Sequence, residues 1–317
     1  MIKYYIKRIK LRLKIFNNKI YVLLNKNKFK KRVAIVSNNK YKNKIEEDIL
    51  LKISFNKHNI NCDIISYEED DYLNYDALII RSIWGYQDNI ELFNNFLNNV
   101  KKNNIKIFNS VDIINYNYHK DIQYELLINN DIPVIKTYFT KDLDEASDLV
   151  SKIKGPVVIK PTISGSGHNT YVIGKVSKNS IELTDIKDKF KDIKTGVMIQ
   201  PYAKEVEDGE LSLIFINKKF LYAIKRYTNI FNNKFEIDYI DKDKVDNKLI
   251  DMGLKILNIK EYENSIYARI DLIKTNSIYK IMEVELVEPE LFLTYIPNCK
   301  YQGYCINEFI QSIINKI

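Results

Sequence analysis

The stretch from Gly155 to Ile173 (GPVVIKPTISGSGHNTYVI) constrains the fold more than any other part of this sequence. A run of β-branched residues predicts a buried strand up to Lys160, and a second strand is predicted from Thr170 onward. The loop between them holds two glycines, whose backbone N–H groups can turn inward and cradle phosphate oxygens beside the charge of the lysine. Because a strand rather than a helix follows the glycines, the loop is neither a Walker loop nor a dinucleotide-binding turn. The alternative is a surface hairpin with a lone lysine.

Size and composition indicate a globular protein of two or three compact units. The chain has 317 residues, of which 45% are apolar and 28% charged, and this balance excludes intrinsic disorder. No apolar run is long enough to span a bilayer. The cysteines Cys62, Cys299 and Cys305 lack the paired spacing of a metal site and favour a reduced, cytoplasmic setting.

The positive charge of the chain is confined to its N-terminal end. The net charge is +8, but residues 1–32 contain 12 Lys or Arg and no Asp or Glu, which leaves 37 basic and 41 acidic residues elsewhere. Apolar residues recur among these charges at helical spacing, at Ile2, Tyr5, Ile9, Leu13, Phe16 and Ile20. A basic amphipathic helix of this kind can lie on an anionic membrane surface. The alternative is a solvated helix whose apolar stripe packs on the body of the protein or on a partner.

Residues 31–110 alternate between strands and helices, which predicts a small parallel α/β sheet. Strands are predicted at 32–36, 62–66, 76–81 and 105–108, and helices at 45–56 and 90–100. In such sheets ligands bind beyond the carboxyl ends of the strands. Arg81, Ser82 and Trp84 follow the third strand, so we expect a substrate site there, with the arginine clamping a carboxylate at two points. The alternative is an exposed loop whose tryptophan caps the core.

The middle of the chain continues this alternation on both sides of the glycine loop. Helices are predicted at 117–129, with Lys120 on its first turn, and at 142–153; strands are predicted at 134–139, 196–200, 211–216 and 220–226. Residues 201–203 form a linker between two lobes, and an acidic stretch follows from Glu205 to Glu210. The predicted strands 211–216 and 220–226 form a hairpin. It ends in Lys225 and Arg226, which we expect to reach back toward a site.

Two further strands carry most of the remaining charged chemistry. They are predicted at 265–274 and 279–289, and the four-residue turn 275–278 separates them. Side chains alternate between the faces of a strand, so Arg269 shares a face with Asp271, and Glu283 shares a face with Glu285. Three carboxylates that converge repel one another unless a cation lies among them, and oxygen ligands suit Mg²⁺. The alternative is a solvent-facing acidic sheet surface.

Taken in order, these parts resemble the ATP-grasp superfamily. The likeness covers residues 31 to about 293 and is carried by IRSIWGYQDN, VVIKPTISGSGHNTY, QPYAKEVEDGELSLIF and YARIDLI followed by MEVELVEPELFL. It is similar to ligases of the glutathione synthetase and D-alanine–D-alanine ligase type, above all to the group of the cycloserine-biosynthesis cyclo-ligase. Gly85 departs from that pattern, in which an acidic residue follows the tryptophan. The implied fold is α/β: a basic extension (1–30), a parallel α/β domain (31–110) and two ATP-grasp lobes (111–200 and 201–317).

The resemblance implies roles for individual residues. Lys120 and Lys160 would bind ATP phosphates, under a loop that includes Ser164, Gly165, Ser166, Gly167 and His168. Gln200 and Tyr202 would frame the adenine, and Glu210, with Glu207 as competitor, would bind the ribose hydroxyls. Asp271, Glu283 and Glu285 would hold two Mg²⁺ ions, with Mn²⁺ as an alternative metal. Lys225, Arg226 and Arg269 would neutralise the transferred phosphoryl group and the developing oxyanion.

The implied reaction is ATP-dependent ligation of a small carboxylate to an amine through an acylphosphate. Two alternatives stay open: a kinase of the same fold that makes a stable phosphoester, and a membrane-surface protein that only senses nucleotide. We expect a cytoplasmic monomer or homodimer. If residues 1–30 bind anionic lipid, the protein would lie at the inner membrane surface. No nucleic-acid partner is expected.

Overall fold

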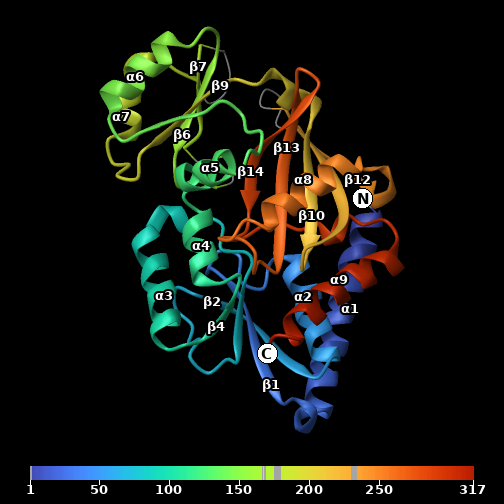
Figure 1. Ribbon diagram of the computed structural model, residues 1–317. Coiled ribbons are helices and arrows are strands. Elements are labelled where there is room, and N and C mark those ends of the chain that lie inside the picture. The colour runs from blue at the N-terminus through green and yellow to red at the C-terminus, as the bar shows by residue number, and fades with distance from the viewer. Residues whose placement is uncertain (1, 166, 168, 175–179, 230–233) are drawn as a thin grey trace. The chain divides into compact units, whose positions relative to one another are not determined.

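The computed structural model describes residues 2–165, 167, 169–174, 180–229 and 234–317 (Figure 1). The chain divides into two compact units. The first contains Met1–Val111 and Glu288–Ile317, and the second contains Asp112–Val287. The C-terminal thirty residues therefore group with the N-terminal unit, whereas the sequence placed them in the last lobe. Our finer division into four parts stays a prediction.

The first unit is built on a parallel sheet, as predicted, and its strand order is β2-β1-β3-β4. Its strands are β1 (Lys31–Ser37), β2 (Ile60–Ser66), β3 (Ala77–Ile80) and β4 (Lys106–Phe108). Its helices are α1 (Ile2–Leu24), α2 (Glu46–Lys57), α3 (Ile90–Lys102) and α9 (Cys299–Ile314), with 3₁₀ turns at Lys26–Lys28, Tyr86–Asn89 and Leu293–Tyr295. All four residues of β3 are buried, which is the pattern of a parallel strand covered on both faces.

The second unit contains two five-stranded sheets. One has the order β5-β9-β6-β7-β8, made of Tyr138–Thr140, Val197–Pro201, Val157–Pro161, Tyr171–Ile173 and Ser180–Ile181. The other has the order β12-β11-β10-β13-β14, made of Lys234–Asp241, Lys219–Asn229, Glu210–Ile216, Tyr267–Thr275 and Ile278–Glu285. The helices are α4 (Val111–Asn117), α5 (Lys120–Asn129), α6 (Leu143–Lys152), α7 (Ile186–Phe190) and α8 (Asn247–Leu257), with 3₁₀ turns at Leu183–Asp185, Lys204–Asp208 and Lys242–Lys244.

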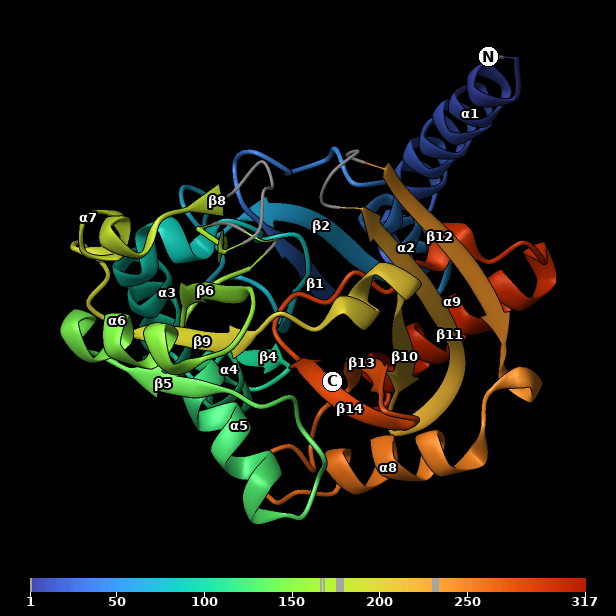
Figure 2. The same cartoon turned by 90° about the horizontal axis from the view of Figure 1, so that it is seen from above.

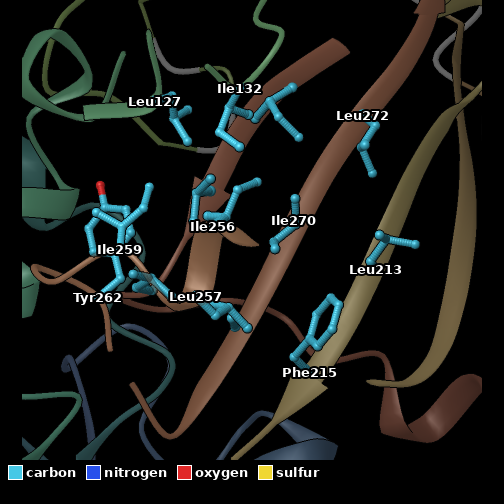
Figure 3. Packing of buried hydrophobic residues seen from close by; sticks show 14 of the residues in the cluster. Leu127, Ile132, Leu213, Phe215, Ile256, Leu257, Ile259, Tyr262, Ile270 and Leu272 are labelled. Atoms are coloured by element: carbon cyan, nitrogen blue, oxygen red, sulfur yellow. The ribbon is translucent and has the colours of Figure 1, made fainter. Parts of the chain in front are cut away.

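Helix α8 covers one face of the second sheet, and this contact forms one of the hydrophobic cores of the unit (Figures 1 and 2). Figure 3 shows Ile256 and Leu257 of the helix beside Leu213, Phe215, Ile270 and Leu272 of the strands. The helix approaches so closely that a Cβ at Gly253 would lie 2.5 Å from the Phe215 ring. Burial of these residues leaves the opposite face of the same strands for polar side chains.

Most predicted elements are confirmed, and the differences are local. The predicted helix 117–129 is α5, which starts three residues later, at Lys120, and the short helix α4 that precedes it was not predicted. The predicted strand 134–139 is reduced to β5 and one isolated bridge between Val134 and Ile281. Strand β12 was not predicted. None of the helices in the described ranges combines the length and apolar character that crossing a membrane requires.

Candidate active site

The register of β13 and β14 brings the predicted charged residues onto one face of the sheet. Asp271 pairs directly with Glu283, and Arg269 pairs with Glu285. Directly paired residues point to the same face, and so do residues two apart along a strand. The four side chains therefore share one face of the sheet, which agrees with the convergence predicted from the sequence.

Asp271 is a buried carboxylate enclosed by donors. Its oxygens lie 2.9 Å from Arg226 Nη2 and 3.0 Å from Arg269 Nε, and the Ser212 hydroxyl donates a hydrogen bond of 2.7 Å. Burial opposes ionisation of Asp271, but the two guanidinium groups outweigh it and hold its pKa below the usual range. Burial lowers the pKa of the Arg269 guanidinium, but the negative charges of Asp271 and Glu285 outweigh burial, so the pKa is raised.

Glu283 forms an ion pair with Lys120, the first residue of α5. Burial works against ionisation of Glu283, but Lys120 and then Lys160 lower its pKa. Lys160 lies at the end of β6, and its own pKa is lowered by burial first and by the charge of Lys120 second. Lys120 and Lys160 thus both act on Glu283, and Glu210 acts on Lys160 as well. Two ammonium groups side by side are point charges suited to an anion such as a triphosphate.

Arg226 connects Glu210, the residue predicted to bind the ribose hydroxyls of ATP, to this cluster. Its Nη2 atom lies 2.7 Å from Glu210 Oε2, and its Nε donates to Ser212 Oγ over 3.0 Å. Burial raises the pKa of Glu210, and Arg226 opposes that rise. Glu207 lies outside this network, on the 3₁₀ turn that precedes β10, where it accepts a 2.8 Å hydrogen bond from the Tyr202 hydroxyl.

Lys225 does not join Arg226 on the carboxylate face. Adjacent residues of β11 point to opposite faces, and Lys225 pairs with Leu211, whereas Arg226 pairs with Glu210. The Lys225 ammonium lies 5.1 Å from the centre of the Tyr227 ring, and its stem passes the backbone of Gly209. The structure thus brings Arg226 and Arg269 together and leaves Lys225 apart.

The glycine loop follows β6, which pairs with β7 as an antiparallel hairpin, as predicted. Ser164 is buried, and Gly167 has a φ of +69°, in the left-handed region that favours glycine. Ser166 and His168 lie outside the described residues. Lys160 thus enters beside a turn of the kind predicted to cradle phosphates, and that role stays a prediction.

The predicted adenine residues lie at the end of β9. The Gln200 side chain is buried and donates to the Tyr124 hydroxyl and to Thr137 Oγ1 over 3.1 and 2.8 Å. The Tyr202 backbone N–H donates to the carbonyl of Pro156 over 2.8 Å. Because the Gln200 amide nitrogen already serves this network, contact of Gln200 with an adenine would use its other polar groups.

The arrangement of the carboxylates shows which mode of binding a divalent metal it could support. In the part of the chain that the structure describes, no three His, Cys, Asp or Glu side chains converge as a ready-made metal site. Mg²⁺ is usually bound by one or two carboxylates that are completed by water and substrate phosphates. Asp271 and Glu283 are carboxylates of lowered pKa on adjacent strands, so they fit that mode and not an all-protein cage.

Comparison with known proteins now identifies the family. Residues 118–291, more than half of the chain, match the model of the RimK-like ATP-grasp domain. The chain belongs to the RimK-like ATP-grasp family. Residues 33–109 match the model of the N-terminal domain of D-cycloserine synthetase. The protein is accordingly an ATP-grasp ligase, an ATP-dependent enzyme that forms carbon–nitrogen bonds, and enzymes of this family use ATP with divalent metal ions.

Solved structures show the same fold at low sequence identity. The crystal structure of D-cycloserine synthetase aligns with a TM-score of 0.73 and 17% identity over 90% of this chain and 99% of that one. D-alanine–D-alanine ligase from Bacillus anthracis aligns with a TM-score of 0.60 and 14% identity over 90% and 96%. A probable α-L-glutamate ligase of Shewanella pealeana is 22% identical over 123 residues. That match covers 39% of this chain and 26% of the relative.

In the ATP-grasp ligase, side chains hold part of the outer edge of strand β14, where no neighbouring strand pairs with it in the described residues. β14 is the last strand of its sheet, and beyond the bridge of Ile281 to Val134 its outer edge faces α4 and α5. The Gln123 side chain donates to the Val284 carbonyl and accepts from its N–H, over 2.9 and 2.8 Å. Asn117 donates to the same carbonyl and accepts from Leu286 N–H, over 2.7 and 2.8 Å. This clasp holds the strand of Glu283 against the helix of Lys120.

The clasp and Ser212 were missed from the sequence. An amide on a helix carries no local sign that its partner is a strand some 160 residues later. Ser212 did leave a signal, because it interrupts the apolar run of β10 two residues after Glu210 and hence on the same face.

We expect Gln123→Ala to lower kcat about 10- to 100-fold, as loss of a group that positions a metal ligand typically does. The Mg²⁺ concentration for half-maximal activity should rise with it, because Glu283 would no longer be held beside the phosphates. Asn130→Ala is the matched control, since Asn130 also donates to a backbone carbonyl of α5, at 2.8 Å. Steady-state rates over a Mg²⁺ titration give the comparison. Equal metal dependence in both variants would rule out a positioning role.

The predicted substrate residues of the first unit form an internal network. Arg81 is 3% exposed and pairs with Glu47, and its Nε lies 3.8 Å from Asp48 Oδ1. Ser82 donates to Asp48 over 2.5 Å. Burial raises the pKa of Asp48 to about 6, although Arg81 opposes the rise. Arg81 and Ser82 thus contact buried carboxylates of α2, and the clamp of Arg81 on a substrate carboxylate stays a prediction.

The same network anchors the segment that follows β14. The Glu47 carboxylate accepts the backbone N–H groups of Leu291 and Leu293, over 3.1 and 2.8 Å. Trp84 is half-buried: its indole N–H donates to the Glu288 carbonyl over 3.2 Å, and its ring meets Tyr41 edge-on. Of the three predicted residues, Trp84 keeps an exposed surface for a ligand.

We expect Arg81→Gln to destabilise the first unit by about 3–5 kcal/mol, because it leaves Glu47 buried without its cation. Trp84 is the single tryptophan of the chain, so its fluorescence reports unfolding of this unit in urea. Lys31→Gln is the control: it breaks an exposed ion pair with Asp76 and should cost at most about 1 kcal/mol. An unchanged urea midpoint in Arg81→Gln, together with a raised KM, would restore the substrate role.

Proposed function

We propose that the protein joins a small, amino-acid-like carboxylate to an amine through an acylphosphate. The observation that carries this proposal is the cluster on one face of the β10–β11–β13–β14 sheet, where Arg226 and Arg269 enclose Asp271 while Lys120 pairs with Glu283. Phosphoryl transfer depends on positioning and electrostatic stabilisation more than on covalent help from the protein. A buried cluster of this composition supplies both.

Lys120 and Lys160 act at the phosphates of ATP in this proposal. Both lysines are held by the fold, since Lys120 starts α5 and its backbone N–H donates to the Thr162 carbonyl just after β6. The glycine loop would lie over the β- and γ-phosphates. Gln200 and Tyr202 would border the adenine, and Glu207 and Glu210 are the two candidates for the ribose hydroxyls.

The substrate carboxylate oxygen would attack the γ-phosphorus, and the bond from that phosphorus to the β,γ-bridging oxygen would break, releasing ADP. Arg226 and Arg269 would stabilise the negative charge that develops on the transferred group. The amine then attacks the acyl carbon, loses a proton, and expels phosphate. A closed site keeps water from the acylphosphate meanwhile.

A divalent metal would be held by Asp271, Glu283 and Glu285 with the phosphates, and two ions are our prediction. When bound, it would neutralise phosphate charge during transfer. The pairing of Glu283 with Lys120 is relevant here, because the lysine keeps the carboxylate ionised and therefore ready to act as a ligand.

Similarity to two ligases supports a small substrate. Residues 33–109 match the N-terminal domain of D-cycloserine synthetase, and the fold aligns with that enzyme and with D-alanine–D-alanine ligase. The carboxyl ends of β1 and β3 in the first unit carry a tightly bonded network of Ser37, Arg81 and Ser82. In our proposal this network fixes the loop that bears Trp84, and Trp84 contacts the substrate.

The proposal is tested by identifying the product. Thermal-shift measurements with a non-hydrolysable ATP analogue would first select carboxylates and amines from amino acids and small peptides. The selected pair is then incubated with ATP and Mg²⁺, and the product is weighed by mass spectrometry. We expect condensation with loss of one water, with one ADP and one phosphate for each product. A product heavier than its substrate by one phosphoryl group, with no condensation, would identify a kinase instead.

A further inference from the structure

Helix α1 carries two apolar stripes on opposite sides. The first faces α2 and consists of the partly buried Leu11, Ile15 and Val22 together with the buried Asn18. Asn56 of α2 donates to the Asn18 side chain over 3.3 Å. With 3.6 residues per turn, these positions lie along one side of the helix. This stripe, and not the predicted one, packs on the body of the protein.

The second stripe points to solvent. It consists of apolar side chains that are each between 40% and 79% exposed: Ile9, Leu13, Phe16, Ile20, Leu23 and Leu24. Their spacing of three and four residues places them on the side opposite Asn18. From Ile9 to Ile20 it is the stripe that the sequence predicted, and packing on α2 does not cover it. Large apolar side chains that gather on an exposed face mark an interaction surface.

The charges beside this stripe select its partner. Lys10 borders it on one side, and Arg12 and Lys19 border it on the other, all exposed. Residues 1–32 contain no acidic residue, so a second copy of the helix would bring like charges together. A nucleic acid would meet the basic side chains but leave the apolar stripe in water. An anionic lipid surface accommodates both, since acyl chains take the stripe and headgroups take the charges.

We propose that α1 lies in the plane of an anionic membrane, with its exposed stripe inserted among the lipids and its other side packed on α2. The helix is roughly 35 Å long, which gives six apolar side chains for insertion along it. Figure 2 shows α1 extending beyond α2, so that its N-terminal turns are clear of the other elements of the first unit. The enzyme would thus work beside the bilayer without crossing it.

Vesicle sedimentation with the full chain tests the proposal. We expect the protein to bind vesicles that contain phosphatidylglycerol and to leave pure phosphatidylcholine vesicles largely unbound. Leu13→Ser with Phe16→Ser should weaken binding at least about tenfold, because two large apolar groups no longer leave water. Arg12→Gln with Lys19→Gln should weaken binding about fivefold for each charge, and high salt should do the same. Leu73→Ser, at an exposed leucine elsewhere in the unit, is the matched control and should bind as the wild type does.

Three results would overturn the proposal. Equal binding of the wild type and the Leu13/Phe16 variant would show that the stripe does not insert. Self-association of the wild type that the same variant abolishes, in sedimentation equilibrium without lipid, would assign the stripe to a second copy. Salt-sensitive binding to RNA with no binding to anionic vesicles would assign the charges to a nucleic acid. None of these readouts depends on the reaction, so the proposed ligase function stands or fails separately.

Discussion

Glu283→Gln should lower kcat by at least about 100-fold while the protein stays folded. The change keeps the shape of the side chain but removes the charge that pairs with Lys120. It also removes the predicted metal ligand that lies beside the phosphates, and loss of one preorganised electrostatic contact in an active site typically costs about 100- to 1,000-fold. Steady-state rates of ADP formation, measured over a Mg²⁺ titration, give both the loss of kcat and the change in metal dependence.

Glu263→Gln is the matched control, because Glu263 is an exposed glutamate in the same unit, just before β13. It should keep the wild-type rate. A Glu283→Gln variant that retains its rate within about twofold would contradict the metal and phosphate assignment of the cluster. A variant that unfolds in urea at a much lower concentration would instead show that the Lys120 pair serves stability.

Lys160→Met should lower kcat/KM for ATP by about 100- to 1,000-fold, because it keeps the apolar stem and removes the charge meant for the transferring phosphates. Bound phosphates would raise the pKa of Lys160, which burial and Lys120 hold low in the free protein. ATP affinity should therefore fall as the pH rises through the pKa of Lys160 in the free enzyme, and Lys160→Met should lose that dependence. Isothermal titration with a non-hydrolysable ATP analogue at several pH values measures both effects.

Lys154→Met is the comparison for this variant. Lys154 lies just before β6 and is exposed, so its removal should leave ATP affinity unchanged. Wild-type affinity and the wild-type pH profile in Lys160→Met would show that this lysine does not contact the nucleotide. The glycine loop would then lack its predicted cationic partner.

The elements and the shared faces of the site strands follow from local patterns. Period-two alternation places Asp271 on one face with Arg269, and Glu283 with Glu285, and the structure confirms both pairs. The same rule shows that Lys225 and Arg226 point to opposite faces, but only the pairing of Glu210 with Arg226 decides which one faces the carboxylates. A local pattern gives a face, whereas register depends on strands far apart in the chain.

Partners that come from distant elements were not predictable. Arg81 follows a strand, as predicted, but its ion pair with Glu47 of α2 could not be read from the sequence. The basic N-terminal helix was predicted correctly as an element, but the sequence left open whether its stripe is buried. Only the packing of Asn18 against Asn56 shows which side faces the protein.

In the proposed reaction, ATP activates the substrate carboxylate as an acylphosphate. Hydroxylamine is small enough to replace the amine, so the protein with ATP, Mg²⁺ and its carboxylate should form a hydroxamate. Its amount should match the ADP released, and Lys160→Met should lose both together. ADP formation with a stable phosphorylated product, and no hydroxamate at any hydroxylamine concentration, would contradict the claim.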